Sequence, residues 1–134
     1  MSQDSRSYYA KVAVTVAAVA VILILVRLLF WPVRTGSAEV ISWDDAGRHI
    51  DRYCTVEGRI VGTYNSGKAC FLNFHPDYAK HFSAVIFAGR YAYFPPTPEQ
   101  YYLHRRVRVT GMVKAYKGRP EIVLESSGQI QILE

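Results

Sequence analysis

The fold class of this chain is decided by residues 106–116, RVRVTGMVKAY, whose side chains alternate between two kinds. One kind is apolar or small: Val107, Val109, Gly111, Val113 and Ala115. The other is mostly polar: Arg106, Arg108, Thr110, Lys114 and Tyr116. Successive side chains of an extended strand point to opposite faces, so this period of two predicts a β-strand with one face in a core and one in water.

Further strands are predicted on both sides of this stretch. Residues 53–64 alternate in the same way, with Cys54, Val56, Gly58 and Ile60 on the inner side. Gly58 within that strand predicts a bulge or a sharp bend. Turn residues 65–67 (NSG) lead into a second strand at 68–75, and a third strand follows at 82–88. The turn at Lys117 and Gly118 leads into a fifth strand at 121–125, with Ile122 and Leu124 pointing inward.

Two short helical elements complete the predicted domain. Ser42 is placed to cap a brief helix that begins at Trp43, and the proline-rich residues 91–104 interrupt the strands before a helical stretch at 99–103. Five strands, a bend in the first, and a helical connection between strands 3 and 4 follow the order of an oligonucleotide/oligosaccharide-binding (OB) barrel. We therefore predict an all-β domain over residues 42–134, a five-stranded OB-fold barrel.

A family resemblance agrees with this prediction. Five runs occur in order: VEGRIV at 56–61, FLNF at 71–74, AVIF at 84–87, VRVTG at 107–111 and YKGRPEI at 116–122. They resemble the nucleic-acid-binding OB domains of the anticodon-binding-like group found in bacterial exported and nuclease-associated proteins. The resemblance covers residues 40–133 and is more specific for the fold than for the ligand, because OB barrels also serve as protein-binding and structural modules.

The N-terminal part predicts a membrane anchor. Residues 12–33 are apolar except for Thr15 and Arg27, and as a helix they would be about 33 Å long, enough to cross the hydrocarbon layer of a lipid bilayer. The alternative is a signal peptide cleaved near residues 36–38, but Arg27, Trp31 and Pro32 make a poor cleavage region. The predicted organisation is a tail at 1–11, one transmembrane helix at 12–33, a linker at 34–41 and the OB domain.

The net charge of the predicted domain does not by itself indicate a nucleic-acid ligand. Four cations and one anion in residues 1–37 leave twelve cations and ten anions, a net charge of +2, in residues 38–134. Cations lie on both sides of the predicted span, but Lys11 directly before it is typical of a bacterial signal anchor. We therefore expect a single-pass membrane protein whose soluble domain is extracytoplasmic, either periplasmic or on the outer side of the inner membrane.

The binding face of an OB barrel lies across strands two and three and between the loops that join strands one to two and four to five. The candidate nucleic-acid-binding residues at those places are Tyr64, Asn65, Lys68, Phe71, Asn73, Tyr116, Lys117 and Arg119. Aromatic rings can stack on bases while Lys and Arg follow the phosphates. Each also has a plainer reading: Phe71 as core, the three cations as solvated turn residues, and Asn73 as a partner for the protein's own groups.

Chemical motifs are scarce. The four histidines are scattered, and His75, Asp77 and His81 lie in a predicted loop without a ligand pattern typical of a metal site. Cys54 and Cys70 are read as buried thiols, with a disulfide as the alternative. We expect no enzyme activity, no metal and no cofactor. The predicted function is a membrane-tethered module for single-stranded nucleic acid; the alternative is a protein-interaction or scaffold domain in a bacterial envelope complex.

Overall fold

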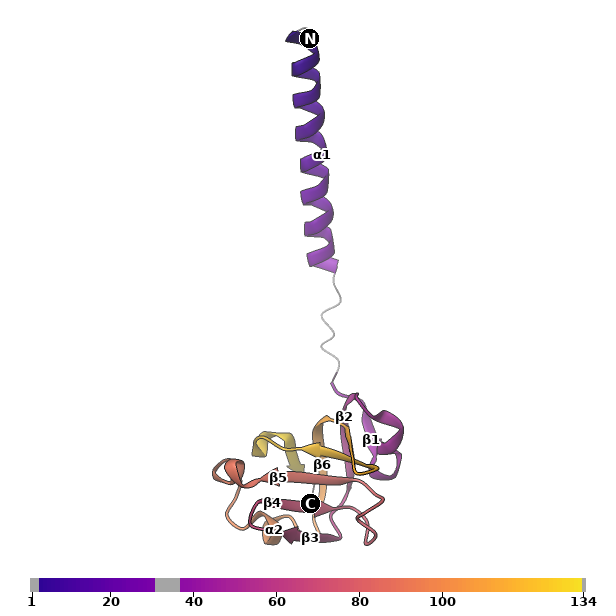
Figure 1. Cartoon of the computed structure of the whole chain (residues 1–134), viewed down its shortest axis with the longest axis vertical. Helices are drawn as coiled ribbons and strands as arrows, with labels where there is room; N and C mark the ends of the chain where they lie inside the picture. Colours follow the sequence, from indigo (N-terminus) through magenta and orange to yellow (C-terminus); the bar gives the residue numbers. More distant parts are fainter. Residues whose placement is uncertain (1–2, 31–36, 134) are drawn as a thin grey trace. The chain divides into compact units, whose positions relative to one another are not determined.

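The described residues of this computed structural model, 3–30 and 37–133, belong to two separate units. The first unit, residues 1–35, contains one helix, α1 (Gln3–Phe30). The second unit, residues 36–134, contains every strand of the described chain and is called the β-domain. Both are drawn in Figure 1.

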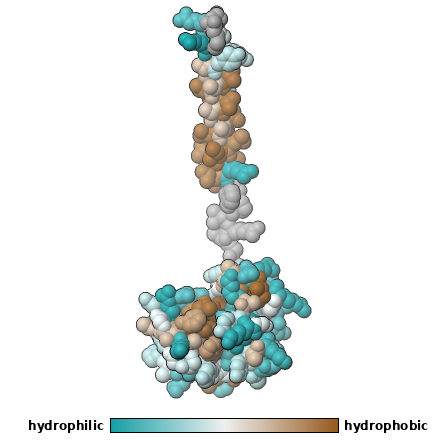
Figure 2. Space-filling view, in the orientation of Figure 1, coloured by the Kyte–Doolittle hydropathy of each residue, from teal (hydrophilic) through white to brown (hydrophobic). Residues whose placement is uncertain are grey.

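Helix α1 begins at Gln3, well before the predicted start at residue 12, so the described part of the predicted tail is helical. The Thr15 hydroxyl donates to the Lys11 carbonyl oxygen at 2.8 Å, so this polar side chain is hydrogen-bonded within the helix. Figure 2 shows mostly hydrophobic side chains along the visible face of the helix. By length and composition, residues Gln3–Leu29 can cross a membrane. Residues 31–36, which include the end of the predicted span and the start of the linker, lie outside the described part.

Over residues 37–133 the β-domain contains nine strands in two sheets, and they do not form the predicted five-stranded barrel as a closed sheet. The first sheet has the order β1 (Val40–Ser42), β2 (Tyr53–Arg59), β6 (Arg106–Met112) and β9 (Ile130–Ile132). The second has the order β3 (Gly62–Asn65), β4 (Ala69–Asn73), β5 (Ser83–Phe87), β8 (Arg119–Val123) and β7 (Lys114–Tyr116).

Four short helices join these strands, so the domain is rich in sheet but not strictly all-β. They are η1 (Trp43–His49), η2 (Ala88–Tyr93), α2 (Pro98–Tyr101) and η3 (Ser127–Gln129). The predicted helix at Trp43 and the helical element between the third and fourth predicted strands are both present. Ser42 occupies the cap position of η1, but its side chain makes no capping hydrogen bond.

Two predicted strands are divided because the chain passes from one sheet to the other. The Ile60 amide donates to the Arg105 carbonyl at 3.0 Å, whereas the next amide, at Val61, donates to the Asn73 carbonyl at 2.9 Å. The predicted strand 53–64 therefore becomes β2 in the first sheet and β3 in the second. The predicted strand 106–116 is divided in the same way, into β6 and β7.

The bend is not at Gly58, where we had predicted it. Gly58 pairs with Val107 in an uninterrupted register between β2 and β6. A Cβ atom there would lie 2.5 Å from Trp43 Cδ1 and 2.7 Å from Phe74 Cδ1, which is too close. Glycine at this position is required by the close approach of two aromatic rings rather than by a bulge.

The predicted linker also ends earlier than expected. Val40 and Ile41 form part of β1, which runs parallel to β2 with Val40 opposite Thr55. Ile41 is 7% exposed and joins the hydrophobic core. Burial of this side chain and pairing with β2 hold the segment in the sheet, so the prediction of a linker is wrong at these two residues.

The inward faces are mostly as predicted. Val107, Val109 and Val113 are fully buried, as are Ile122 and Leu124. Ala115 is exposed, so its predicted inward position is wrong. Beyond Val113 the chain has left the first sheet and forms the edge strand β7 of the second, which means that the alternation of β6 does not continue into the core.

Both cysteines are free thiols within the core. Cys54 is 1% exposed and Cys70 is fully buried. Burial raises the pKa of the Cys70 thiol to about 12, with a smaller contribution from the Glu99 carboxylate. The reading of these residues as small buried hydrophobes is therefore confirmed.

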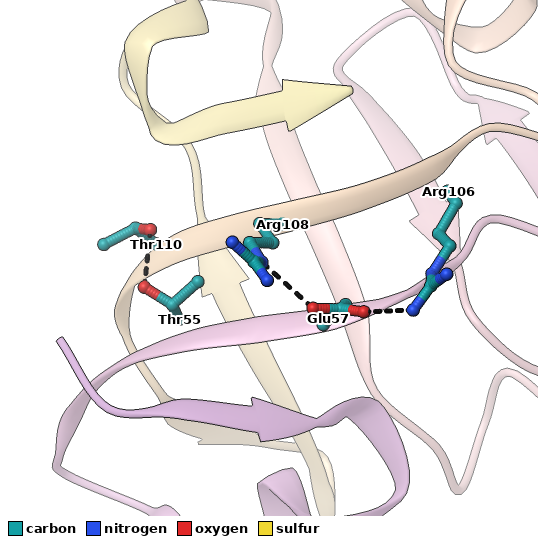
Figure 3. Close-up of polar contacts among 5 residues, drawn as sticks. All are labelled: Thr55, Glu57, Arg106, Arg108 and Thr110. Atoms are coloured by element: carbon teal, nitrogen blue, oxygen red, sulfur yellow. Dashed lines mark hydrogen bonds and ion pairs between the residues drawn. The ribbon is translucent and has the colours of Figure 1, made fainter. Parts of the chain in front are cut away.

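The outer face of the first sheet carries a cross-strand ion-pair cluster, drawn in Figure 3. Glu57 on β2 accepts hydrogen bonds from Arg108 Nε at 2.9 Å and from Arg106, both on β6. Beside them the Thr55 and Thr110 hydroxyls lie 2.9 Å apart. The bond from Arg108, followed by that from Arg106, holds the pKa of the Glu57 carboxyl below its usual range.

Replacing Glu57 by glutamine is expected to lower the melting temperature at neutral pH. A carboxyl whose pKa is depressed by folding stabilises the native state above its unfolded pKa, near 4.5, and this stabilisation is lost as the pH falls. The difference between the two proteins should therefore narrow towards about pH 3 in thermal melts. Glu39→Gln, which removes an exposed partner of Arg52, is the matched control and should change little. If the difference in melting temperature between the unaltered protein and Glu57→Gln stays constant with pH, the carboxylate of Glu57 is not the source of the stabilisation.

Candidate functional site

A groove of about 530 Å³ lies on the outer face of the second sheet, beside the loop at residues 74–82 that joins β4 to β5. We call it the aromatic groove. It is lined by Gly62, Thr63, Tyr64, Phe71, Asn73, His75, Pro76, Tyr78 and Arg119. Four of these, Tyr64, Phe71, Asn73 and Arg119, were candidates from the sequence.

Strand alternation positions the groove residues. On β4, Cys70 and Leu72 are fully buried in the core, which directs Phe71 and Asn73 to the outer face. Tyr64 is the cross-strand partner of Phe71, so neighbouring strands supply the two rings. On β8, Ile122 points into the core and Arg119 lies on the groove side.

The aromatic pair forms one wall. The rings of Tyr64 and Phe71 are stacked, with centroids 6.3 Å apart and an interplanar angle of 21°. Tyr64 is 62% exposed. Phe71 is half-buried and does not belong to the core cluster, so the alternative reading of Phe71 as a core residue is wrong. The exposed face of this aromatic pair is a surface on which another planar ring can stack.

Arg119 is the charged residue of the groove. It is 9% exposed, so its reading as a solvated turn cation is wrong. Its guanidinium carbon lies 5.6 Å from the centroid of the Phe71 ring, a cation–π geometry. Nη1 donates to the Tyr78 carbonyl at 3.0 Å, and Nη2 lies 4.0 Å from Glu121 Oε2. Nε is buried and has no hydrogen-bond partner among the described residues.

Glu121 shares this buried environment. Desolvation raises the pKa of its carboxyl above the usual value, and the Arg119 guanidinium opposes that rise. The long separation of the pair leaves Arg119 only partly neutralised. The 4.0 Å distance is too long for a hydrogen bond, so Nη2 remains able to donate to an acceptor in the groove.

Asn73 presents a second donor. The buried Ser83 hydroxyl donates to Asn73 Oδ1 at 2.8 Å. Within the described chain the Asn73 amide nitrogen makes no hydrogen bond, and the residue lines the groove. The sequence left open whether Asn73 serves the protein or a ligand; its oxygen serves Ser83 and its nitrogen remains available.

The loop at 74–82 closes one end of the groove and was not predicted as part of the site. His75 and His81 stack with ring centroids 3.8 Å apart, and both contact Trp43. The Asp77 amide donates to His75 Nδ1 at 2.9 Å, which fixes this ring. In the described ranges no three His, Cys, Asp or Glu side chains gather as metal ligands. The HPDY run at 75–78 was the available signal, but its contact with Arg119 is not evident from sequence.

The other four candidates lie outside the lining of the groove. Asn65 donates to Glu99 at 3.2 Å and accepts from the Tyr91 hydroxyl at 3.2 Å, so its amide connects the hairpin to the rest of the domain. Lys68 is exposed at the β3–β4 turn. Lys117 Nζ lies 5.5 Å from the centroid of the Tyr116 ring at the β7–β8 turn.

Comparison with known proteins yields a fold and no family. No family model matches the chain, and no curated protein matches it. Asparaginyl-tRNA synthetase from Pyrococcus horikoshii superposes with a TM-score of 0.51 and 17% identity, over 73% of this chain and 24% of that one. The Entamoeba histolytica asparaginyl-tRNA synthetase in complex with asparaginyl-adenylate gives 0.52 and 17%, over 74% and 24%. The chain thus spans about a quarter of each, and the likeness supports an OB-type fold for the β-domain.

Proposed function

We propose that this chain is a membrane-tethered, non-catalytic OB-type module that binds single-stranded nucleic acid in the aromatic groove. The observation that carries the proposal is the stacked pair of Tyr64 and Phe71 beside Arg119, whose Nη2 has no acceptor within hydrogen-bond distance among the described residues. An aromatic surface can stack a base of any sequence, and a guanidinium supplies positive charge and donors. The groove therefore offers both kinds of contact that a single strand requires.

Two further facts support a nucleic-acid ligand. The groove lies on the face formed by β3, β4 and β8, and OB-type domains commonly use a sheet face for oligonucleotides. The two similar solved structures are named as tRNA synthetases, and tRNA is a nucleic acid. The module acts by binding alone, since the sequence has no phosphate-cradling glycine loop and no recognised nucleophile motif.

The N-terminal helix is the tether in this proposal. Residues 12–33 lie in the bilayer, and the short tail with Lys11 stays on the cytoplasmic side, which places the β-domain outside the cytoplasm. Helix α1 is apolar nearly all round, which suits a lipid-facing segment.

The tether predicts how the protein fractionates. Alkaline extraction of membranes should leave the full-length protein in the pellet, because a spanning helix is held by the hydrocarbon and not by surface charge. A variant with Leu23 and Leu25 both replaced by arginine, in the middle of the predicted span 12–33, should move to the supernatant. Release of the unaltered protein as a soluble form that begins near residue 39 would show that the N-terminal segment is a cleaved signal peptide and not a retained anchor.

Binding is tested by fluorescence anisotropy of the detergent-solubilised full-length protein with a labelled single strand at several salt concentrations. We expect binding at low salt that weakens as salt rises, because phosphate contacts release counterions. Replacing the turn residues Lys68 and Lys117 by alanine should weaken binding to all sequences alike and flatten the salt dependence. A folded protein that binds no strand at low salt would overturn the proposal and favour the protein-interaction module.

A further inference from the structure

We infer that the aromatic groove selects its base, preferring guanine to adenine, because three of its side chains present hydrogen-bond donors to the groove. This inference rests on the proposed function and adds a specificity to it. It depends on three side chains: Asn73, Arg119 and His75. The Tyr64 and Tyr78 hydroxyls can rotate to donate or accept, so they do not discriminate.

The Asn73 amide is oriented by a buried neighbour. Ser83 is fully buried, and its hydroxyl hydrogen has Asn73 Oδ1 as its acceptor at 2.8 Å. That bond fixes the amide with its oxygen towards Ser83 and its NH₂ group available. After a half-turn of the amide its NH₂ group would donate to the Ser83 oxygen, and the buried hydroxyl hydrogen of Ser83 would lose this acceptor, which is unfavourable.

Arg119 contributes donors only, since a guanidinium has no acceptor. Its Nε–H is buried without a partner among the described groups and does not itself reach the groove. Within the described chain Nη2 has no acceptor closer than Glu121 Oε2 at 4.0 Å, so a ligand acceptor that reaches Nη2 gains a charge-assisted hydrogen bond. The arginine is positioned by the Tyr78 carbonyl, which holds Nη1 at 3.0 Å.

His75 is the third donor. Its Nδ1 accepts from the Asp77 amide at 2.9 Å, so that nitrogen carries a lone pair and the ring proton of the neutral imidazole lies on Nε2. Among the residues that the structure describes, no carboxylate lines the groove. Glu121 stays paired with Arg119 and is not one of the lining residues.

Guanine fits this arrangement and adenine does not. The Hoogsteen edge of guanine presents two adjacent acceptors, O6 and N7, which is the pattern that an arginine fork recognises. Adenine presents N7 beside the N6 amino group, so one donor of the base would face the donors of the groove. While Tyr64 and Phe71 stack the ring, the donor groups distinguish between the two purines.

The test varies one purine in an otherwise constant oligothymidine, with competition anisotropy on the full-length protein in detergent. Guanine should bind about 5- to 150-fold more tightly than adenine. Hypoxanthine keeps O6 and N7 and lacks the 2-amino group, so it should behave like guanine. In contrast, 7-deazaguanine lacks N7 and should lose much of the preference. This series needs no protein variant and is therefore independent of folding.

Asn73→Asp supplies the protein side of the test. It keeps the acceptor for Ser83 and replaces the available donor with an acceptor, so the ratio of guanine to adenine affinity should fall towards one or below. Gln131→Glu on β9 makes the same change of charge in the other sheet and should leave the ratio unchanged. The ratio is read instead of the affinity because the added charge repels every phosphate.

The outcomes separate the two claims. Equal affinity for guanine and adenine in a protein that binds single strands overturns the selectivity and leaves the proposed function standing. Tighter binding of adenine overturns the selectivity as well, and indicates the opposite orientation of the Asn73 amide. A folded protein that binds no strand at low salt overturns both.

Discussion

Replacing Val109 by aspartate is expected to unfold the β-domain. Val109 is fully buried on β6, between Val56 on β2 and Ile130 on β9. A lone carboxylate at this position has no partner, and burying it costs several kcal/mol against a total stability of about 5–15 kcal/mol for a domain of this size. Thermal melting followed by circular dichroism should show no cooperative transition of the sheets at neutral pH.

The control is the next residue along the same strand. Arg108 points outward, its side chain is 42% exposed, and its main contact is the bond to Glu57. Arg108→Ala should therefore shift the melting temperature only slightly, since exposed ion pairs contribute about 0–1 kcal/mol. Equal loss of stability in both variants would mean that the inward and outward faces of β6 are assigned wrongly.

The inward and outward faces of β6 were predicted correctly from the sequence, whereas the position of Ala115 beyond it was not, and both results have a physical reason. Alternation predicts a face only as long as a strand remains in one sheet. Val107 and Val109 obey it, whereas Ala115 follows the point at which the chain changes sheets and is exposed. Gly62 and Gly111 lie close to the breaks at Ile60–Val61 and Val113, but hydrogen bonds to distant segments decide where the chain changes sheets.

Short strands were not predicted from the sequence for a related reason. β1 has three residues, too few to establish a period, and its pairing with β2 is what makes it a strand. The predicted five-stranded barrel likewise counted only the long runs. The brief strand β9 depends on its pairing with β6, about twenty residues earlier, and was not recognised from local pattern. The residues of β7 were predicted as the end of the strand at 106–116, whereas they pair with β8 in the second sheet.

The candidate site was predicted in part. Tyr64, Phe71, Asn73 and Arg119 came from the positions at which OB barrels bind, and the structure brings all four to one groove. The loop at 74–82 was missed because the bond from Arg119 to the Tyr78 carbonyl joins residues 41 positions apart. Burial of Arg119 was missed for the same reason, since a cation next to a turn glycine is ordinarily solvated.

Replacing Tyr64 by alanine is expected to remove a large part of the affinity for single strands. Tyr64 is the most exposed member of the stacked pair in the aromatic groove, so a base that enters the groove meets its ring. Loss of one base–aromatic stack costs about 1–3 kcal/mol, or about 5- to 150-fold in the dissociation constant. The salt dependence should stay nearly unchanged, because a tyrosine contacts no counterion-releasing phosphate.

Tyr116 provides a matched control for Tyr64. It is also an exposed tyrosine, at 47%, on an edge strand of the same sheet, but it packs against Lys117 and does not line the groove. The sequence predicted equal roles for the two tyrosines, whereas the geometry predicts that Tyr116→Ala binds nearly as well as the unaltered protein. Anisotropy titrations of both variants at one low and one moderate salt concentration decide between these expectations. If the two variants weaken binding equally, the strand follows the turns of the domain and the aromatic groove is not its site.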